Sequence, residues 1–214
     1  MEALYHSGHI PATLFFCCGR KWFAECVRCG IITKRSETMN VIDAVKSRRS
    51  IRAYRKGPVP QAALDDMLEA ARLAPSWKNN QSFSYILVQD RQLIGQLGEI
   101  TGYNPSQSAY ENAEYFLVLC GDPTLSGRRE EKEYYMTDAA ISMEQMMLVA
   151  EENGVGMCWV GAFYENPVKK LLNIPEDIRV VALSPVGIPD EEPEAKPRRT
   201  LQEMVFLNKY GNLL

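Results

Sequence analysis

Residues 115–120 read Tyr-Phe-Leu-Val-Leu-Cys, an unbroken apolar run that ends at Gly121-Asp122-Pro123. A strand covered on both faces is apolar throughout, whereas a strand covered on one face alternates apolar and polar residues. The run therefore predicts a central strand with a layer of other elements on each of its sides.

Helical and strand patterns alternate around this strand. Helices are predicted at 40–48, 60–74, 91–100, 130–153 and 166–172, strands at 83–88, 157–163 and 180–186, and a polar loop at 101–112. The core side of the longest helix is assigned to Ile141, Met143, Met146, Met147, Leu148 and Ala150. No Gly-rich phosphate loop directly follows a strand, so the pattern indicates an α/β or α+β sandwich and not a Rossmann unit.

The composition limits the partners of the chain. Its 214 residues suit one well-buried domain, and a net charge of −3 with a pI near 5.6 argues against nucleic acid or an anionic membrane as the main partner. No apolar run is long enough to span a bilayer.

Residues 1–38 differ from the rest. They hold both histidines (His6, His9) and four of the six cysteines (Cys17, Cys18, Cys26, Cys29), which leaves a zinc or iron–sulfur site and a secretory signal as alternatives. The favoured hypothesis is that they are a translated, non-native leader. Residues 34–39 (KRSETM) can be encoded by a string with AAGGAG shortly before ATG, which is typical of a bacterial ribosome-binding site. We expect translation to begin at Met39, and a native peptide that begins earlier would contradict this.

Beyond that segment only two cysteines remain, Cys120 and Cys158, each within an apolar run. Buried, unpaired cysteines suit a reducing compartment, which predicts a cytoplasmic protein.

Arg48-Arg49-Ser50-Ile51-Arg52 follows the first predicted helix. A guanidinium group can donate two parallel hydrogen bonds to a phosphate, and Arg48 and Arg52 would share a face if the helix continued. The alternative is that these side chains only offset the negative end of the helix dipole.

Three further segments are candidates for a site. Residues 74–81 (APSWKNNQ) bring a hydroxyl, three amides and an indole into one loop, Gly161-Ala162 offers bare backbone to a flat ring, and Lys196-Pro197-Arg198-Arg199 is a second basic cluster. An ordinary polar loop, a strand kink and surface charge are the respective alternatives.

Histidine is absent after residue 9, so no catalytic triad can be assembled in the remainder of the chain. An enzyme of this composition would leave the difficult chemistry to a cofactor.

The order RRSIR, APSWKNNQSF, GVGMCWVGAF, IPEDIRVVALSPVGIP and KPRR closely resembles the nitroreductase family of FMN-dependent oxidoreductases, over residues 39–214. The resemblance implies an α+β sandwich with a central, mostly antiparallel sheet flanked by helices, in an intertwined homodimer with FMN at the interface. The FMN-binding residues that it implies are Arg48, Arg49, Ser50, Arg52, Pro75, Ser76, Asn79, Gln81, Gly161, Ala162, Lys196 and Arg198.

The resemblance also implies a role for each group. Residues 48–52 would hold the phosphate, ribityl chain and pyrimidine edge, and Lys196 and Arg198 would add phosphate contacts. The backbone of Gly161 and Ala162 would lie beside the hydride-accepting nitrogen, and the 75–81 loop would often come from the partner subunit. The family loop usually ends Gln-Pro-Trp, whereas here Gln81 precedes Ser82-Phe83.

The implied activity is a ping-pong transfer of electrons from NAD(P)H through FMN to a nitroaromatic, a quinone or a similar small acceptor. No metal and no side-chain acid is expected in the reaction. Two alternatives stay open: a specialised flavoenzyme of the same fold, such as a reductive dehalogenase, and a non-catalytic flavin-binding module or a regulator that binds metal through the N-terminal Cys and His residues.

Overall fold

The central element of the fold is β3 (Tyr115–Gly121), as the apolar run predicts. A computed structural model describes residues 39–214. All seven residues of β3 are buried, and their side chains alternate between two cores: Tyr115, Leu117 and Leu119 on one side, Phe116, Val118 and Cys120 on the other.

Every pairing in the described sheets is antiparallel. The main sheet has the order β1-β7-β3-β2, and β6 also pairs with β7. The strands are β1 (Tyr54–Arg55), β2 (Phe83–Val88), β6 (Gly156–Met157) and β7 (Arg179–Pro189), and a separate hairpin joins β4 (Arg128–Arg129) to β5 (Lys132–Glu133). The predicted α+β architecture is confirmed.

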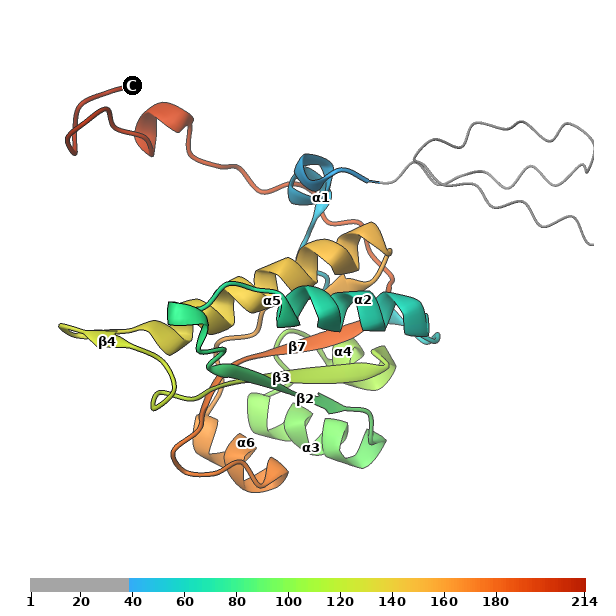
Figure 1. The fold of residues 1–214 in the computed structure, drawn as a ribbon. Coiled ribbons are helices and arrows are strands. Elements are labelled where there is room, and N and C mark those ends of the chain that lie inside the picture. The colour runs from blue at the N-terminus through green and yellow to red at the C-terminus, as the bar shows by residue number, and fades with distance from the viewer. Residues whose placement is uncertain (1–38) are drawn as a thin grey trace, which may run out of the picture. The chain divides into compact units, whose positions relative to one another are not determined.

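Helices cover both faces of the sheet. In Figure 1, α2 (Gln61–Arg72) and α5 (Tyr134–Glu152) lie above it, and α3 (Arg91–Thr101) and α6 (Glu165–Leu172) lie below it. The short helix α4 (Gln107–Asn112) packs in the same core as α3 and α6. The remaining helical elements are the short helix α1 (Val41–Ser47) and the 3-10 turns η1 (Trp77–Asn79) and η2 (Leu201–Glu203), of which α1 and η1 contact α5.

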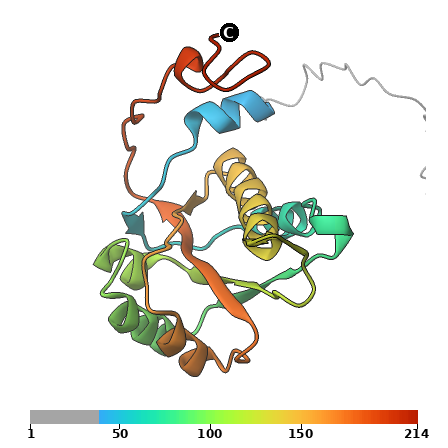
Figure 2. The ribbon, with the colours of Figure 1, turned by 90° about the vertical axis from the view of Figure 1, so that its left-hand side faces the viewer.

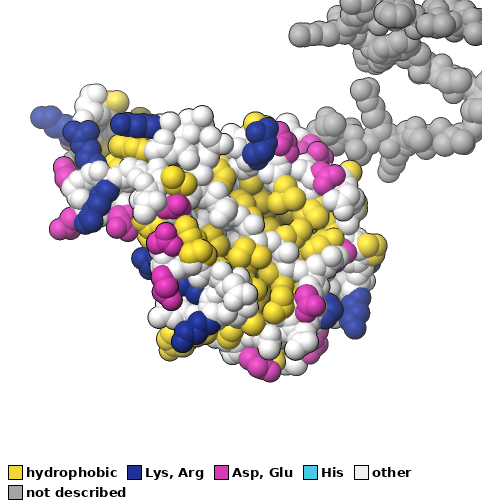
Figure 3. All heavy atoms as spheres, turned by 60° about the horizontal axis from the view of Figure 1, so that its bottom comes forward, with side chains coloured by type: hydrophobic (Ala, Val, Ile, Leu, Met, Phe, Trp, Pro, Cys, Tyr) yellow, Lys and Arg dark blue, Asp and Glu magenta, His cyan; other side chains and the backbone are white. Residues whose placement is uncertain are grey.

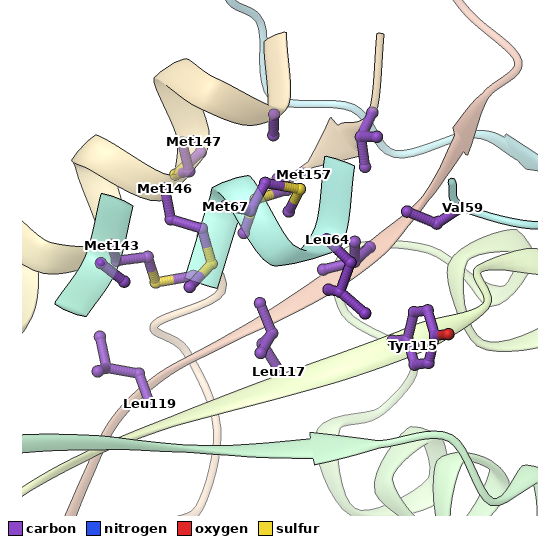
Figure 4. Close-up of a cluster of buried hydrophobic side chains, with 14 of the residues drawn as sticks. Val59, Leu64, Met67, Tyr115, Leu117, Leu119, Met143, Met146, Met147 and Met157 are labelled. Carbon is purple, nitrogen blue, oxygen red and sulfur yellow. The ribbon is translucent and has the colours of Figure 1, made fainter. Parts of the chain in front are cut away.

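The upper core is rich in methionine. Figure 4 shows Met143, Met146 and Met147 of α5 facing Met67 of α2 and Leu117 of β3. The predicted core side of this helix is largely right. Ile141, however, is exposed, because the helix turns it away from α2 and the sheet.

The lower core lies between the sheet and α3, α4 and α6. Phe116 stacks on Tyr110 with a ring separation of 4.3 Å. Figure 3 shows that apolar side chains also gather in the middle of the outer surface on this side, with charged side chains around them.

The predicted strand at 180–186 extends to Arg179–Pro189, and three other segments differ more from the prediction. The expected loop at 101–112 contains α4, which Ser106 caps and which buries Ala109 and Tyr110. The long helix begins at Tyr134 and not at residue 130, because the preceding charged residues pair as the β4–β5 hairpin. The expected strand at 157–163 is reduced to β6 and a single bridge at Val160.

No helix within residues 39–214 has the length and hydropathy needed to cross a membrane.

Candidate functional site

The first basic cluster begins where α1 ends. Asn40 caps the start of this helix by accepting a hydrogen bond from the Asp43 amide, and Arg48 is already the C-terminal cap, with ψ at 131°. The helix does not continue beyond Ser47, so the condition under which Arg48 and Arg52 would share a helical face is not met. The chain beyond is anchored by Ile51, whose buried amide donates to Met157 O over 2.9 Å.

Arg49 has two roles in this structure. Its Nη1 donates to the carbonyls of Lys46, Ser47 and Arg48 at 2.7–2.9 Å, which caps the negative end of the helix. Its Nε is buried and is the one buried side-chain polar atom among the described residues without a hydrogen-bond partner. The helix-end interpretation thus describes the contacts of Nη1, and phosphate binding by the cluster stays a prediction.

One pocket brings the two basic clusters together. Its volume is about 400 Å³, and it is lined by Val45, Lys46, Arg48, Arg49, Ser50, Arg52, Pro193, Glu194, Ala195, Lys196 and Arg198. The segment after β7 returns beside α1 in both ribbon views (Figures 1 and 2). Six of the lining residues are Lys or Arg and only one, Glu194, is acidic. The pocket would therefore attract anions.

Glu191 fixes the approach of the returning segment. Its Oε1 accepts hydrogen bonds from the backbone amides of Arg52 and Ala53, the second at 3.0 Å. An ion pair, Arg48 Nε to Glu144 Oε1 at 3.6 Å, links the first cluster to α5. Glu191 thus ties the start of the segment that carries the second cluster to the chain beside the first cluster.

The strand-like segment that precedes Gly161 also lies beside the cluster. Burial raises the pKa of the Cys158 thiol, and the nearby Arg52 and a hydrogen bond with Ser50 act in the opposite direction. Cys120 and Cys158 are both free and buried, as predicted.

Gly161 and Ala162 follow three and four residues after Cys158. Both are exposed, and Asn104 donates a hydrogen bond to Ala162 O over 3.2 Å. Gly161 lines a different, smaller cavity of about 260 Å³ with Tyr135, Phe163 and Arg179 among its neighbours. Its backbone is open to a ligand, but it does not line the basic pocket.

The 75–81 loop lies at the far end of α2 and contributes nothing to the lining of the basic pocket. Ser76 Oγ accepts from the Gln81 amide over 2.9 Å, and Lys78, Asn79 and Gln81 all have positive φ. One chain therefore brings together six of the twelve predicted site residues, namely Arg48, Arg49, Ser50, Arg52, Lys196 and Arg198, and leaves Pro75, Ser76, Asn79, Gln81, Gly161 and Ala162 elsewhere.

Sequence reasoning missed three polar residues that shape these segments: Glu191, Asn104 and Asp138. Asp138 could have been noticed, because it lies four and eight residues before Ser142 and Met146 on the buried side of α5. Glu191 and Asn104 carry no sequence signal, since their partners are distant backbone groups.

The metal hypothesis for His6, His9 and the N-terminal cysteines, like the leader hypothesis, lies outside the described residues. Within residues 39–214, no cluster of three or more His, Cys, Asp and Glu residues is suited to a metal ion.

Comparisons with known proteins agree on one family. The model of the nitroreductase family matches residues 45–104 and 102–188. The crystal structure of a nitroreductase family protein from Clostridium novyi NT is 32% identical, with a TM-score of 0.67 over 82% of this chain and 97% of that chain.

Two curated relatives have more specific names. The FMN reductase (NAD(P)H) of Bacillus subtilis is 29% identical over 80% of this chain and 75% of its own length. The NADPH-flavin oxidoreductase of Vibrio harveyi is 28% identical over 81% of this chain and 76% of its own length.

Proposed function

The chain belongs to the nitroreductase family, and from this premise we propose that it binds FMN and passes electrons from NAD(P)H to nitroaromatics, quinones or similar small acceptors. At the coarser level it is an NAD(P)H-dependent flavin oxidoreductase of that family.

The observation that carries the proposal is the single pocket between the two basic clusters. A phosphate monoester needs several strong donors in a small volume, and guanidinium groups supply them in paired geometry. Arg48, Arg49, Arg52, Lys196 and Arg198 all line this pocket, and the unpaired Nε of Arg49 suits an additional acceptor. Of these residues, Arg48, Arg49, Lys196 and Arg198 fit the phosphate end of FMN, and Arg52 is assigned to the pyrimidine edge of its ring.

The other half of the proposed site is divided between separate segments. The backbone at Gly161 and Ala162 is exposed and has only small side chains of its own, which suits the edge of a flat ring. Ser76, Asn79 and Gln81 supply polar groups on a loop that does not reach the basic pocket of its own chain.

A second copy of the chain would bring that loop to the pocket. In α1, Val41, Ile42 and Val45 are exposed, as are Leu201, Met204, Leu207, Leu213 and Leu214 in the C-terminal segment. Exposed apolar side chains in this number are typical of a protein interface. We therefore propose a homodimer in which each FMN lies between the two subunits.

FMN, when bound, would accept a hydride from NAD(P)H and pass electrons to an oxidant. The protein residues would bind and orient. The guanidinium group of Arg52 would favour negative charge on the pyrimidine edge of the ring, and the bare backbone at 161–162 would leave room for each substrate in turn. Protons would come from water, because the described residues contain no histidine.

The two buried, free thiols suit a reducing compartment, so we place the protein in the cytoplasm.

The test is spectroscopic. Purified protein should show flavin absorbance that bleaches anaerobically on addition of NADPH or NADH, and a nitroaromatic or quinone should restore it with ping-pong kinetics. Protein that neither retains nor takes up FMN would overturn the proposal. A flavin that bleaches, but is restored by none of a panel of acceptors, would overturn only the substrate class.

A further inference from the structure

Asp138 is a buried carboxylate on α5 that does not line the basic pocket. It is 3% exposed, and no cation lies within salt-bridge distance of it among the described residues. A buried charge without a counter-ion is stable only when hydrogen bonds compensate it.

Three donors from three different places supply that compensation. Asp138 Oδ1 accepts from the Trp77 amide at 2.8 Å, and Oδ2 accepts from the hydroxyls of Ser82 at 2.8 Å and Ser126 at 3.0 Å. Trp77 lies in the 75–81 loop, Ser82 immediately precedes β2, and Ser126 lies in the turn after β3. One carboxylate thus fastens the loop and the turn to the same helix.

The loop that Asp138 holds is unusual in its backbone. Lys78, Asn79 and Gln81 have φ of 49°, 59° and 53°, the left-handed region that residues other than glycine rarely adopt. Several such residues in one short loop persist only where the surroundings determine the conformation, and they tend to occur at functional sites.

The surroundings of the loop restrict it further. Trp77 stacks on Tyr134 with a ring separation of 4.2 Å, and a Cβ on Gly127 would lie 2.2 Å from Trp77 Nε1. Asn80 donates to Leu125 O over 2.6 Å. Asp138 is the charged member of this set, and it is the acceptor for the first amide of η1.

We propose that Asp138 is a positioning residue for flavin binding: it fixes the 75–81 loop in the shape that presents Ser76, Asn79 and Gln81 to FMN. The inference rests on the proposed function and adds to it a residue that does not touch the cofactor. It predicts that hydrogen-bonding capacity at position 138, and not charge, is what the site requires.

The Asp138→Asn and Asp138→Ala variants separate these two requirements. In Asp138→Asn, the amide oxygen can still accept from Trp77, and its NH2 group can donate to the two serine hydroxyls, which rotate to accept. In Asp138→Ala all three hydrogen bonds are lost. Ser142→Ala is the matched control, since Ser142 lies one turn further along α5, is fully buried and bonds Tyr85, away from the loop.

Two measurements are made on each protein: hydrogen–deuterium exchange over residues 76–82 without flavin, and the Kd for FMN from fluorescence quenching. Asp138→Ala should raise exchange at the Trp77 amide and the Kd for FMN by about tenfold or more. In Asp138→Asn, the exchange rate of the Trp77 amide and the Kd for FMN should both stay within about threefold of wild type. Ser142→Ala should change neither the exchange rate nor the Kd, even if it lowers the thermal stability of the protein.

If Asp138→Ala does not fold, Ser126→Ala removes one of the three donors and should raise both quantities by a few-fold. Wild-type FMN affinity in Asp138→Ala, or in Ser126→Ala when only that variant folds, would overturn this inference alone. Wild-type protein that binds no FMN would overturn the proposed function, and with it the flavin part of the inference.

Discussion

Arg52 is the residue whose role is most directly testable. Its side chain lines the basic pocket and donates to Ser50 O over 3.1 Å. Arg52→Ala should weaken FMN binding by about tenfold to a hundredfold, since a hydrogen bond to a charged group contributes about 1.5–3 kcal/mol, or lower the potential of the bound flavin. Fluorescence titration and redox titration with a reference dye measure these effects.

Arg55→Ala is the control for Arg52→Ala. Arg55 lies three residues further on, in β1, is exposed, and does not line the pocket. An equal loss of FMN affinity in both variants would show only a general effect of positive charge. Unchanged affinity and potential in Arg52→Ala would refute the role given to Arg52.

Glu165 gives a residue-scale prediction about pH. The pKa of Glu165 lies below its ordinary value, chiefly because Arg179 donates hydrogen bonds to its carboxylate at 2.9 Å. Burial acts in the opposite direction. A lowered folded-state pKa stabilises the protein above the unfolded-state pKa of about 4.3, and this contribution is lost as pH falls through the folded value.

Glu165→Gln should therefore be less stable than wild type at pH 7, and the difference should shrink below about pH 4.3. Urea unfolding across this range measures it. Glu69→Gln is the control, because the Glu69–Arg72 pair is exposed and contributes little. A difference for Glu165→Gln that does not vary with pH would contradict the argument.

At the scale of elements, two glycines differ in what surrounds them. In the interior of α3, a Cβ on Gly95 would meet nothing within 4 Å, whereas on Gly187 of β7 it would lie 2.9 Å from the backbone of Ala113. Gly95→Ala should stabilise the protein by about 0.5–1 kcal/mol through helix propensity. Gly187→Ala should destabilise it by about 1–3 kcal/mol through overpacking. Thermal unfolding distinguishes the two, and the same sign for both would contradict the packing described here.

Much of the element order follows from hydrophobic pattern, and the failures have physical causes. Residues 83–88 form β2 with the predicted bounds, because a continuous apolar run between polar turns leaves few alternatives. Helix α4 was missed because only six residues form it and its stability comes from burying Tyr110 against Phe116. No local pattern could show that contact.

The candidate site, like the fold, was predictable where it depends on local sequence and not where it depends on contacts between distant residues. Arginine clusters are visible in sequence, and the pocket unites both of them. The hydrogen bonds that hold these segments in place are not visible in the sequence. Glu191 accepts from the amide of Arg52, 139 residues away, and Asp138 accepts from the amide of Trp77, 61 residues away. The cofactor-binding roles assigned to the basic clusters, to Gly161 and Ala162, and to the 75–81 loop all stay predictions.

At the scale of the whole molecule, association should control cofactor retention. Ile42→Glu places a charge on the exposed apolar face of α1 and should shift the protein from dimer to monomer and reduce its bound FMN. Light scattering with size-exclusion chromatography and flavin absorbance measure the two effects. Gln96→Glu adds the same charge at an exposed position of α3 and should leave both unchanged. A monomeric wild type with full FMN occupancy would refute the dimer.

The alternation along β3 makes both helical layers depend on one strand. Odd-numbered residues from 115 to 119 belong to the methionine-rich core, and even-numbered residues from 116 to 120 belong to the opposite one. Neither layer can separate from the sheet without exposing half of the side chains of that strand to water. The domain should therefore melt in a single step, with its amides on both sides losing protection at the same denaturant concentration.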